Sequence, residues 1–570
     1  MNRFSMLASI PTVAIAIALA FAGTARAQTD AIHYRVTAEA KGDRLAALAV
    51  TLTMPAHLGE PLTFDLPSLV AADRAAAGLA VDGAEIEADA ANAKASDQLH
   101  VRATAATVAL HYRLRSDGSD SPLANQDNPQ RNPALRNLWF GLKGEQALVL
   151  PRGRERTAAT LDLDDIPPGW TATTSLSGPA TVADVADSLM IGGRSYHLME
   201  RAVGDATLRL AYPDALKDTA ADLLDTSARV LAAEWQFWRA PAQPFFIGLV
   251  QMKDAGDYGG RGLHGGFALY MGDKVPRSEW LHLIAHENLH TWISRRIGGF
   301  PAHDDDLEAW LNEGFTEAYT ARILLEAGLW TPAQFVADWN HSLVRYGASP
   351  ARDEPNTRIL ADRHRDPDIE WLPYDRGRIL AVLWDRKLRD SSHGRTGLDE
   401  VMRAQVLQAA RNDASGGVVS ADALLPIMAT QVAGVDLSAD IARYVDRGEL
   451  PVLPDDTFGP CVRVVQVTRP VFDHGFDYLA TLKAHGHLVG LEPGGPAERA
   501  GMHEGDKLHF DEVYSNDSSI ALSYGVDNPD GTRHKVTYLP EGQRRVTLQQ
   551  LELVPASMPE HRCKKGMATP

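Results

Sequence analysis

The sequence predicts a multidomain α+β protein: an N-terminal antiparallel β domain, a mostly helical middle domain and a C-terminal domain that is again rich in strands. Its 570 residues suffice for three or four domains with hydrophobic cores. Apolar residues recur at every second position up to about residue 210, at helical spacing from Asp214 to about 450, and in strand patterns over the last segment. These changes of period predict domains at 28–210, 211–455 and 456–570.

Composition excludes several classes of protein. The chain has 74 acidic and 56 basic residues, a net charge of −18, which argues against nucleic-acid binding and against a polybasic membrane surface. Two cysteines exclude a dense disulfide scaffold and a four-thiolate metal site. Any metal here must therefore be bound by histidines and carboxylates.

The first residues have the pattern of a secretory signal peptide. Arg3 precedes an apolar run over 7–22, and Ala25-Arg26-Ala27 offers small residues where a signal peptidase cuts. We expect cleavage after Ala27, so that residues 1–27 are removed and the protein is periplasmic or secreted. A retained membrane anchor is the alternative, which Pro11 and the small-residue site disfavour. No later stretch is long enough to span a bilayer, so no membrane span is expected after cleavage.

The elements of the first two parts follow from their periodicity. Alternation predicts strands around two segments, Leu48-Val50-Leu52-Met54 and Val108-Leu110-Tyr112-Leu114. From Asp214 the apolar positions lie on one helical face, behind Pro213. A short strand over 245–250 and a glycine-rich stretch over 259–266 follow, and helices continue to a Pro-containing linker at 450–454.

One helix carries the residues for chemistry, His286-Glu287-Asn288-Leu289-His290. Histidines four apart project to the same side of a helix, so both imidazoles can bind one Zn²⁺, and Glu287 can act as general base toward a water there. Ser278 is the expected N-cap of this helix and Gly298-Gly299 its end. His282 lies one turn earlier on the same face, where it could support a metal ligand from outside, contact substrate or pack as an ordinary histidine, and we favour the last two roles.

A catalytic zinc needs a third protein ligand and an open position. The downstream candidates are His303, Asp304, Asp305, Asp306, Glu308, Glu313 and Glu317. A metzincin continuation would need glycine and histidine where the chain has Ile293 and Arg296. Glu308 and Glu313 would lie about 140° apart on one helix, so only one can face the metal. We choose Glu313, because the neighbouring Gly314 indicates the close approach of another element.

These residues resemble a known group. His286-Glu287-x-x-His290 followed by Trp310-x-x-Glu313-Gly314 is similar to the gluzincin zinc metallopeptidases, whose catalytic domain is aminopeptidase N-like, and His290-Thr291-Trp292 with Arg295-Arg296-Ile297 resembles their glycyl aminopeptidase family. The resemblance implies a β domain, a thermolysin-like catalytic domain at 211–455 and a C-terminal PDZ domain. It also implies one Zn²⁺ per chain, bound by His286, His290 and Glu313.

Two further segments gain roles from the resemblance. Tyr374, in Tyr374-Asp375-Arg376-Gly377, is similar to the tyrosine that stabilises the oxyanion, where a phenol donor helps most in a dry site. Related aminopeptidases carry a glutamate in the glycine-rich strand that binds the free α-amino group of the substrate, and this chain has none there. Substrate contacts are expected instead from Gly262, His264, Gly265 and Gly266, along an edge strand that pairs with an extended peptide.

The C-terminal segment resembles a PDZ domain over residues 490–506, including Pro496-Ala497 and Gly505-Asp506. Such a groove can bind a peptide C-terminus, and Gly475-Phe476 is a weak match to the carboxylate-binding loop. Cys461 and Cys563 bracket this segment, and after export we expect them to form a disulfide.

We therefore predict an exported zinc metallopeptidase that acts on peptides, an aminopeptidase for small N-terminal residues such as Gly or Ala. An endopeptidase without a free-amine requirement is one alternative. A periplasmic PDZ peptide-binding scaffold with a structural zinc site is the other, although such a site has no need of the general base Glu287.

Overall fold

The computed structural model describes residues 31–87, 97–124, 127, 132–263, 265–293, 295–299, 305–362, 366–415, 417–512, 516–528, 530–554 and 560–568. The predicted signal peptide 1–27 and its cleavage site lie outside these ranges. No helix among the described residues has the length and apolar character needed to cross a membrane. The chain divides into two compact units, one formed by residues up to 120 and 133–190, the other by 121–132 and 191–570.

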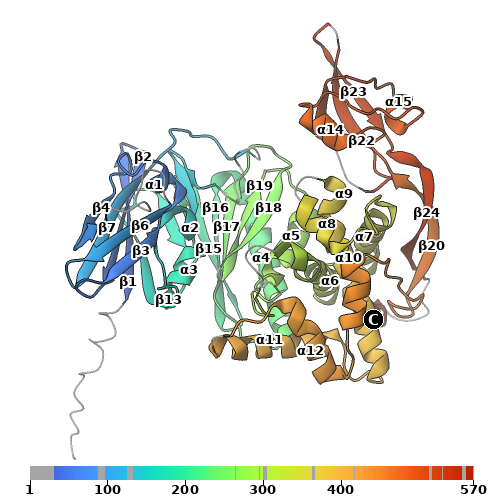
Figure 1. The fold of residues 1–570 in the computed structure, drawn as a ribbon, viewed down its shortest axis with the longest axis horizontal. Coiled ribbons are helices and arrows are strands. Elements are labelled where there is room, and N and C mark those ends of the chain that lie inside the picture. The colour runs from blue at the N-terminus through green and yellow to red at the C-terminus, as the bar shows by residue number, and fades with distance from the viewer. Residues whose placement is uncertain are drawn as a thin grey trace, which may run out of the picture. The chain divides into compact units, whose positions relative to one another are not determined.

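The first unit is built from three sheets, with strand orders β13-β11-β1-β2-β7-β4, β10-β3-β6-β5 and β12-β14-β9-β8 (Figure 1). Its strands are β1 (Ile32–Lys41), β2 (Arg44–Pro55), β3 (Pro61–Asp65), β4 (Ala80–Asp82), β5 (Ala84–Ile86), β6 (Gln98–Ala103), β7 (Thr107–Arg115), β8 (Ala134–Leu135), β9 (Trp139–Lys143), β10 (Leu150–Pro151), β11 (Ala158–Asp164), β12 (Thr171–Thr174), β13 (Ala180–Thr181) and β14 (Leu189–Gly193). Three short helices join them: α1 (Ser68–Ala72), α2 (Gly144–Ala147) and α3 (Val182–Ala186).

The alternation expected in this unit is confirmed. Every second residue from Leu48 to Met54 in β2 and from Val108 to Leu114 in β7 is buried, and the two strands pair in register, with Leu52 opposite Leu110. The prediction of an antiparallel domain is wrong for β1 and β11, which pair in parallel. These two strands lie far apart in the chain, so no hairpin turn forces them to run in opposite directions.

The second unit begins with a five-stranded mixed sheet of order β15-β16-β17-β19-β18. Its strands are β15 (Tyr196–Val203), β16 (Ala206–Pro213), β17 (Phe245–Gln251), β18 (Tyr258–Leu263) and β19 (Gly266–Met271). The expected boundary at residue 210 needs correction, because β16 pairs in parallel with β17 and so belongs to this sheet. Periodicity alone could not show this, since a strand looks alike in either domain.

One helix of this unit, α4, lies between β16 and β17 in the chain, and the others follow the sheet. Helix α6 packs against α5 and α10, and α5 also packs against β18 (Figure 1). The helices before the C-terminal part are α4 (Lys217–Trp238), α5 (Arg277–Leu289), α6 (Ala309–Glu326), α7 (Pro332–Ala348), α8 (Asn356–Asp362), α9 (Pro367–Glu370), α10 (Leu372–Ser391), α11 (Leu398–Ala414), α12 (Ala421–Ala433) and α13 (Ser438–Ile441). A 3₁₀ turn over Asp305–Glu308 leads into α6. The predicted helix after Asp214 is α4, whose buried face includes Ala220, Leu223, Leu224, Val230 and Leu231.

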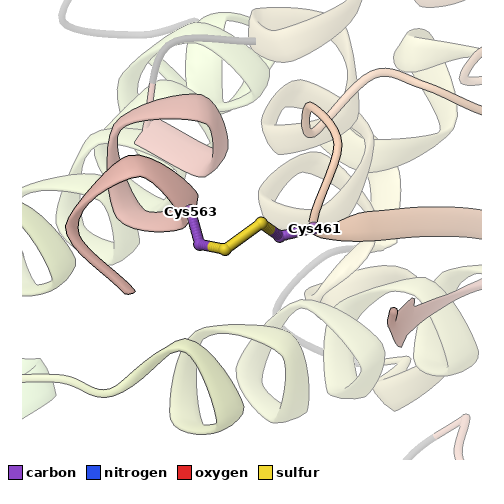
Figure 2. The surroundings of a disulfide bond; sticks show 2 residues. All are labelled: Cys461 and Cys563. Carbon is purple, nitrogen blue, oxygen red and sulfur yellow. A yellow bond between two sulfur atoms is a disulfide. The ribbon is translucent and has the colours of Figure 1, made fainter. Parts of the chain in front are cut away.

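The C-terminal part consists of a long two-stranded ribbon, a three-stranded sheet and short helices. Its elements are β20 (Val462–Phe472), α14 (Tyr478–Lys483), α15 (Pro496–Arg499), β21 (Leu508–Glu512), β22 (Leu522–Asp527), β23 (Arg533–Tyr538), β24 (Glu541–Leu553) and α16 (Glu560–Ala568). The expected disulfide is confirmed: Cys461, just before β20, is bonded to Cys563 in α16 (Figure 2). Helix α16 packs against α6, and Met567 joins the hydrophobic core of the second unit.

Candidate active site

Helix α5 presents both histidines of the motif to one side. Its buried apolar residues, among them Trp280, Leu281 and Ile284, join the core beneath the sheet and so orient the helix. The helix starts at Arg277 after Pro276 rather than at a Ser278 cap, and it ends at Leu289, well before the expected glycines. His290 is its C-cap and keeps right-handed helical dihedrals, so the spacing of four residues still brings the two imidazoles together.

Three side chains converge on one point. His286 Nε2 and His290 Nε2 lie 3.0 Å apart, and Glu313 Oε2 of α6 is 3.2 Å from the first and 3.5 Å from the second. Among the described residues, these three form the group of ligand atoms close enough to hold a metal ion. In a tetrahedral zinc site with bonds near 2.0 Å, ligand atoms lie about 3.3 Å apart. The donor set and its spacing therefore fit Zn²⁺.

Glu313 reaches this point because α6 crosses α10 closely. A Cβ on Gly314 would lie 2.4 Å from Gly377 Cα, and a Cβ on Gly377 would lie 1.7 Å from the Trp310 carbonyl oxygen. The close approach predicted from Gly314 is thus present, and glycine is required on both helices. Glu308 ends the 3₁₀ turn before α6. His303 and Asp304 lie outside the described residues, as do the side chains of Asp305 and Asp306.

A second carboxylate, Glu317, was a candidate for the third metal ligand, and it lies instead on the far nitrogen of His286. Glu317 Oε1 lies 2.8 Å from His286 Nδ1, and its Oε2 lies 3.1 Å from His282 Nε2. His282 is therefore an outer partner of the site through Glu317, rather than the substrate contact or packing residue we expected. A carboxylate on the remaining nitrogen fixes the tautomer and orientation of a metal-binding histidine. The spacing of four residues between Glu313 and Glu317 was the available signal.

The charged groups of this cluster shift the pKa values of their neighbours. Burial alone would lower the pKa of His286, but Glu313 and Glu317 on its two nitrogens raise that pKa well above its usual range. Burial alone would raise the pKa of Glu313, but His290 and His286 together hold it far below its ordinary value. The cluster thus keeps Glu313 ionised, which is the form that binds a metal.

Glu287 projects about 100° around α5 from His286 and lies against the edge strand β18. A Cβ on Gly260 of β18 would lie 2.6 Å from Glu287 Oε1, so the strand can pass here only because residue 260 is glycine. Burial raises the pKa of Glu287, while the charges of His290, His286 and Arg295 oppose that rise. Gly260 is a site residue that the sequence analysis missed, although it belongs to the glycine-rich stretch.

Tyr374 is placed in the first turn of α10, beside the histidines. Its ring centroid lies 6.3 Å from that of His286 and 5.1 Å from that of Trp371. The next residue, Asp375, is buried and accepts two hydrogen bonds from Arg345 of α7, at 2.7 and 2.8 Å. This bidentate pair fixes the start of α10, and with it the position of Tyr374.

The glycine-rich residues divide between two strands. Gly262 lies in β18, the outermost of the five described strands of the sheet, as the predicted edge strand requires. Gly265, with φ +64°, forms the turn that Gly266 follows at the start of β19. A Cβ on Gly266 would lie 2.2 Å from the Phe246 carbonyl oxygen, so this glycine serves the packing of the sheet. His264 lies outside the described residues.

Comparison with known families agrees with this geometry. Residues 279–372 match the model of the M61 glycyl aminopeptidase family. The matched segment contains His286, Glu287, His290 and Glu313, and it ends before Tyr374. This match supports a zinc metallopeptidase. Comparison with the curated proteins gives no match.

Comparison with solved structures gives matches to several zinc metallopeptidases and related proteins. The crystal structure of an aminopeptidase N family protein from Idiomarina loihiensis is similar with a TM-score of 0.65 at 15% identity, over 94% of this chain and 100% of that one. An M1 zinc metallopeptidase from Deinococcus radiodurans gives a TM-score of 0.46 at 17% identity, over 75% and 95% of the two chains. A mutant of the Deinococcus enzyme with a bound Tyr-Ser-Ala substrate gives 0.47 at 17% identity, with the same coverage. The first of these likenesses shows that the chain has an aminopeptidase N-like fold.

Proposed function

We propose that the protein is an exported zinc metallopeptidase that hydrolyses peptides, with one Zn²⁺ bound by His286, His290 and Glu313. The convergence of these three side chains, with Glu287 on the same helix, carries the proposal. The predicted cleavage after Ala27 and the disulfide between Cys461 and Cys563 both suit an oxidising compartment outside the cytoplasm.

The residues divide the chemistry between them. A bound zinc supplies a Lewis acid that makes water more acidic and polarises a carbonyl. Glu287 takes the proton from the attacking water and passes it to the leaving amine, a role that its raised pKa suits. Tyr374 donates its phenolic hydrogen to the oxygen on which negative charge develops. Glu317 and His282 hold His286 in the orientation that metal binding needs.

Replacing the proposed base tests this function directly. Glu287→Gln keeps the shape and the metal ligands but cannot accept the proton, so we expect zinc content near one per chain and peptide hydrolysis reduced at least about 100-fold. Glu326→Gln, an exposed change on α6 that removes the same charge, is the control. Metal content by mass spectrometry and hydrolysis of a peptide mixture with and without chelator report both quantities. Normal turnover by Glu287→Gln would exclude the assigned base.

We propose an aminopeptidase for small N-terminal residues such as Gly or Ala, on the strength of the matched segment over 279–372. One observation favours the endopeptidase alternative: the edge strand beside Glu287 has Gly262 and no carboxylate of its own to bind a free amine. Hydrolysis rates of a glycyl or alanyl chromogenic amide and its N-acetylated form decide between them. Equal rates would exclude an amine-anchored mechanism.

We propose further that residues 456–570 form a PDZ-like domain, since α15 begins at Pro496-Ala497 as that pattern predicts. A cavity of about 410 Å³ lies beside the Gly475-Phe476 loop, and Asp473, Asp477 and Glu492 are among its lining residues. A peptide carboxylate would there face several negative charges, with Arg544 as a neighbouring cation. This groove is tested by comparing the binding of one peptide with a free C-terminus and with an amidated C-terminus. Peptide binding without cleavage of any peptide would favour the scaffold alternative.

A further inference from the structure

One face of the edge strand β18 lies against three charged side chains, Glu279, Glu287 and Arg295, which follow it in the chain. A strand places alternate residues on the same face, and in β18 these are Tyr258, Gly260 and Gly262. The Tyr258 hydroxyl donates to Glu279 Oε2 at 2.8 Å. Gly260 lies against Glu287, and a Cβ on Gly262 would lie 3.7 Å from Arg295 Nη2.

The strand edge therefore has opposite charges at its two ends. Glu279 stands at the Tyr258 end, Arg295 stands at the Gly262 end, and the reacting carboxylate Glu287 lies between them. Four residues of strand span about 13 Å, so each charge lies about two peptide residues from the position beside Glu287. Both Glu279 and Arg295 are exposed, and thus accessible to a peptide laid along β18.

Arg295 gives the Gly262 end of β18 a positive charge, which determines the kind of group that can bind there. Gly262 contributes no side chain, and the guanidinium of Arg295 lies next to the position that a side chain there would occupy. A guanidinium repels an ammonium group and forms bidentate hydrogen bonds with a carboxylate. The arrangement thus favours an anionic group where an amine-binding site would need a negative charge.

We propose, on the basis of the metallopeptidase function above, that Arg295 is a specificity-determining residue. It binds an aspartate or glutamate side chain of the peptide within about two residues of the scissile bond, on the side that lies along Gly262. Glu279 gives the other side of the scissile bond a preference for basic residues.

A matched set of N-acetylated peptides tests this proposal. The set contains one neutral parent peptide and four variants, with Asp or Lys placed two residues before or two residues after the cleaved bond. We expect Asp on one side, and only that side, to raise kcat/KM about threefold to fivefold at low salt, the size of an exposed ion pair. The gain should shrink in 0.5 M salt, which screens exposed charges.

Variants assign the preference to one residue. In Arg295→Gln the ratio of the Asp peptide to the neutral peptide should fall to about one, and in Arg295→Glu the Lys peptide should be preferred at the same position. Arg411→Gln, which removes an exposed arginine of α11, should keep the wild-type ratio. Glu279→Gln should keep the Asp preference and lose the Lys preference on the opposite side.

The ratio within each enzyme separates two kinds of failure. If the wild type cleaves neither these peptides nor a glycyl or alanyl chromogenic amide, the metallopeptidase function itself is wrong. If it cleaves the amide and none of the acetylated peptides, it is an aminopeptidase and the peptide subsites proposed here are wrong. If it cleaves the peptides and Arg295→Gln leaves the Asp-to-neutral ratio unchanged, the assignment of Arg295 is wrong. Fluorescence anisotropy with labelled peptides on the Glu287→Gln background gives an independent readout, and we expect weaker binding of the Asp peptide when Arg295 is also replaced.

Discussion

Two histidines of this protein are buried to nearly the same degree, yet their pKa values are shifted in opposite directions. His286 in the metal site is 7% exposed and His474 in the C-terminal part is 6% exposed. Carboxylates face both ring nitrogens of His286, so its pKa lies well above the usual range. His474 lies among aromatic rings, with its Nδ1 3.1 Å from the Tyr524 hydroxyl, and burial lowers its pKa to about 3. Burial lowers the pKa of both histidines, and at His286 the neighbouring carboxylates reverse that shift.

A disulfide within the C-terminal part should have the largest effect on stability when it is removed. The disulfide between Cys461 and Cys563 closes a loop of about 100 residues and holds α16 against α6. Replacing both cysteines with alanine should lower the free energy of unfolding by about 4 kcal/mol. Urea unfolding, with and without reductant, measures this loss. Reductant should shift the wild-type midpoint and leave the double variant unchanged, and a wild type insensitive to reductant contradicts the prediction.

Loss of the Glu317 carboxylate beside His286 should have a smaller effect, and this effect should be on metal binding. Glu317→Gln removes the charge from His286 Nδ1 but leaves the three ligand side chains in place. We expect the zinc affinity to fall about 10- to 100-fold, since outer partners of metal-binding histidines contribute that much. Competition with a chromogenic chelator measures the affinity, and Glu326→Gln on the same helix is the control. Unchanged affinity would show that Glu317 does not support His286.

The smallest effect is expected from His474, which lies among aromatic rings: a loss of stability in mild acid. The pKa of His474 is about 3 when folded and about 6.5 when unfolded, so between these values the unfolded chain binds the extra proton. Stability contributed by neutral His474 is therefore present above pH 6.5 and decreases as the pH falls. From pH 7.5 to 5.5 this amounts to about 1.4 kcal/mol. Thermal melts at both pH values should show a larger decrease in wild type than in His474→Phe, and equal decreases would contradict the assignment.

The sequence was enough to predict the fold in outline, but not the domain boundaries or the pairing of distant strands. Alternation found β2 and β7, and helical spacing found α4, because each pattern depends on near neighbours in the chain. The parallel pairing of β1 with β11 and the addition of β16 to the second sheet depend on distant partners. A strand has the same apolar pattern whichever sheet it joins.

By itself, the sequence indicated which residues of α5 could bind a metal and which could act as the base beside them, because 3.6 residues per turn fix how His286, Glu287 and His290 project. It also indicated Glu313, through the glycine that lets α6 approach α10. Only the tertiary structure decided that Glu317 backs His286, that Gly260 lies on Glu287 and that Arg295 faces Gly262. These contacts join different elements, and their distances are set by the packing of helices and sheet rather than by spacing along the chain.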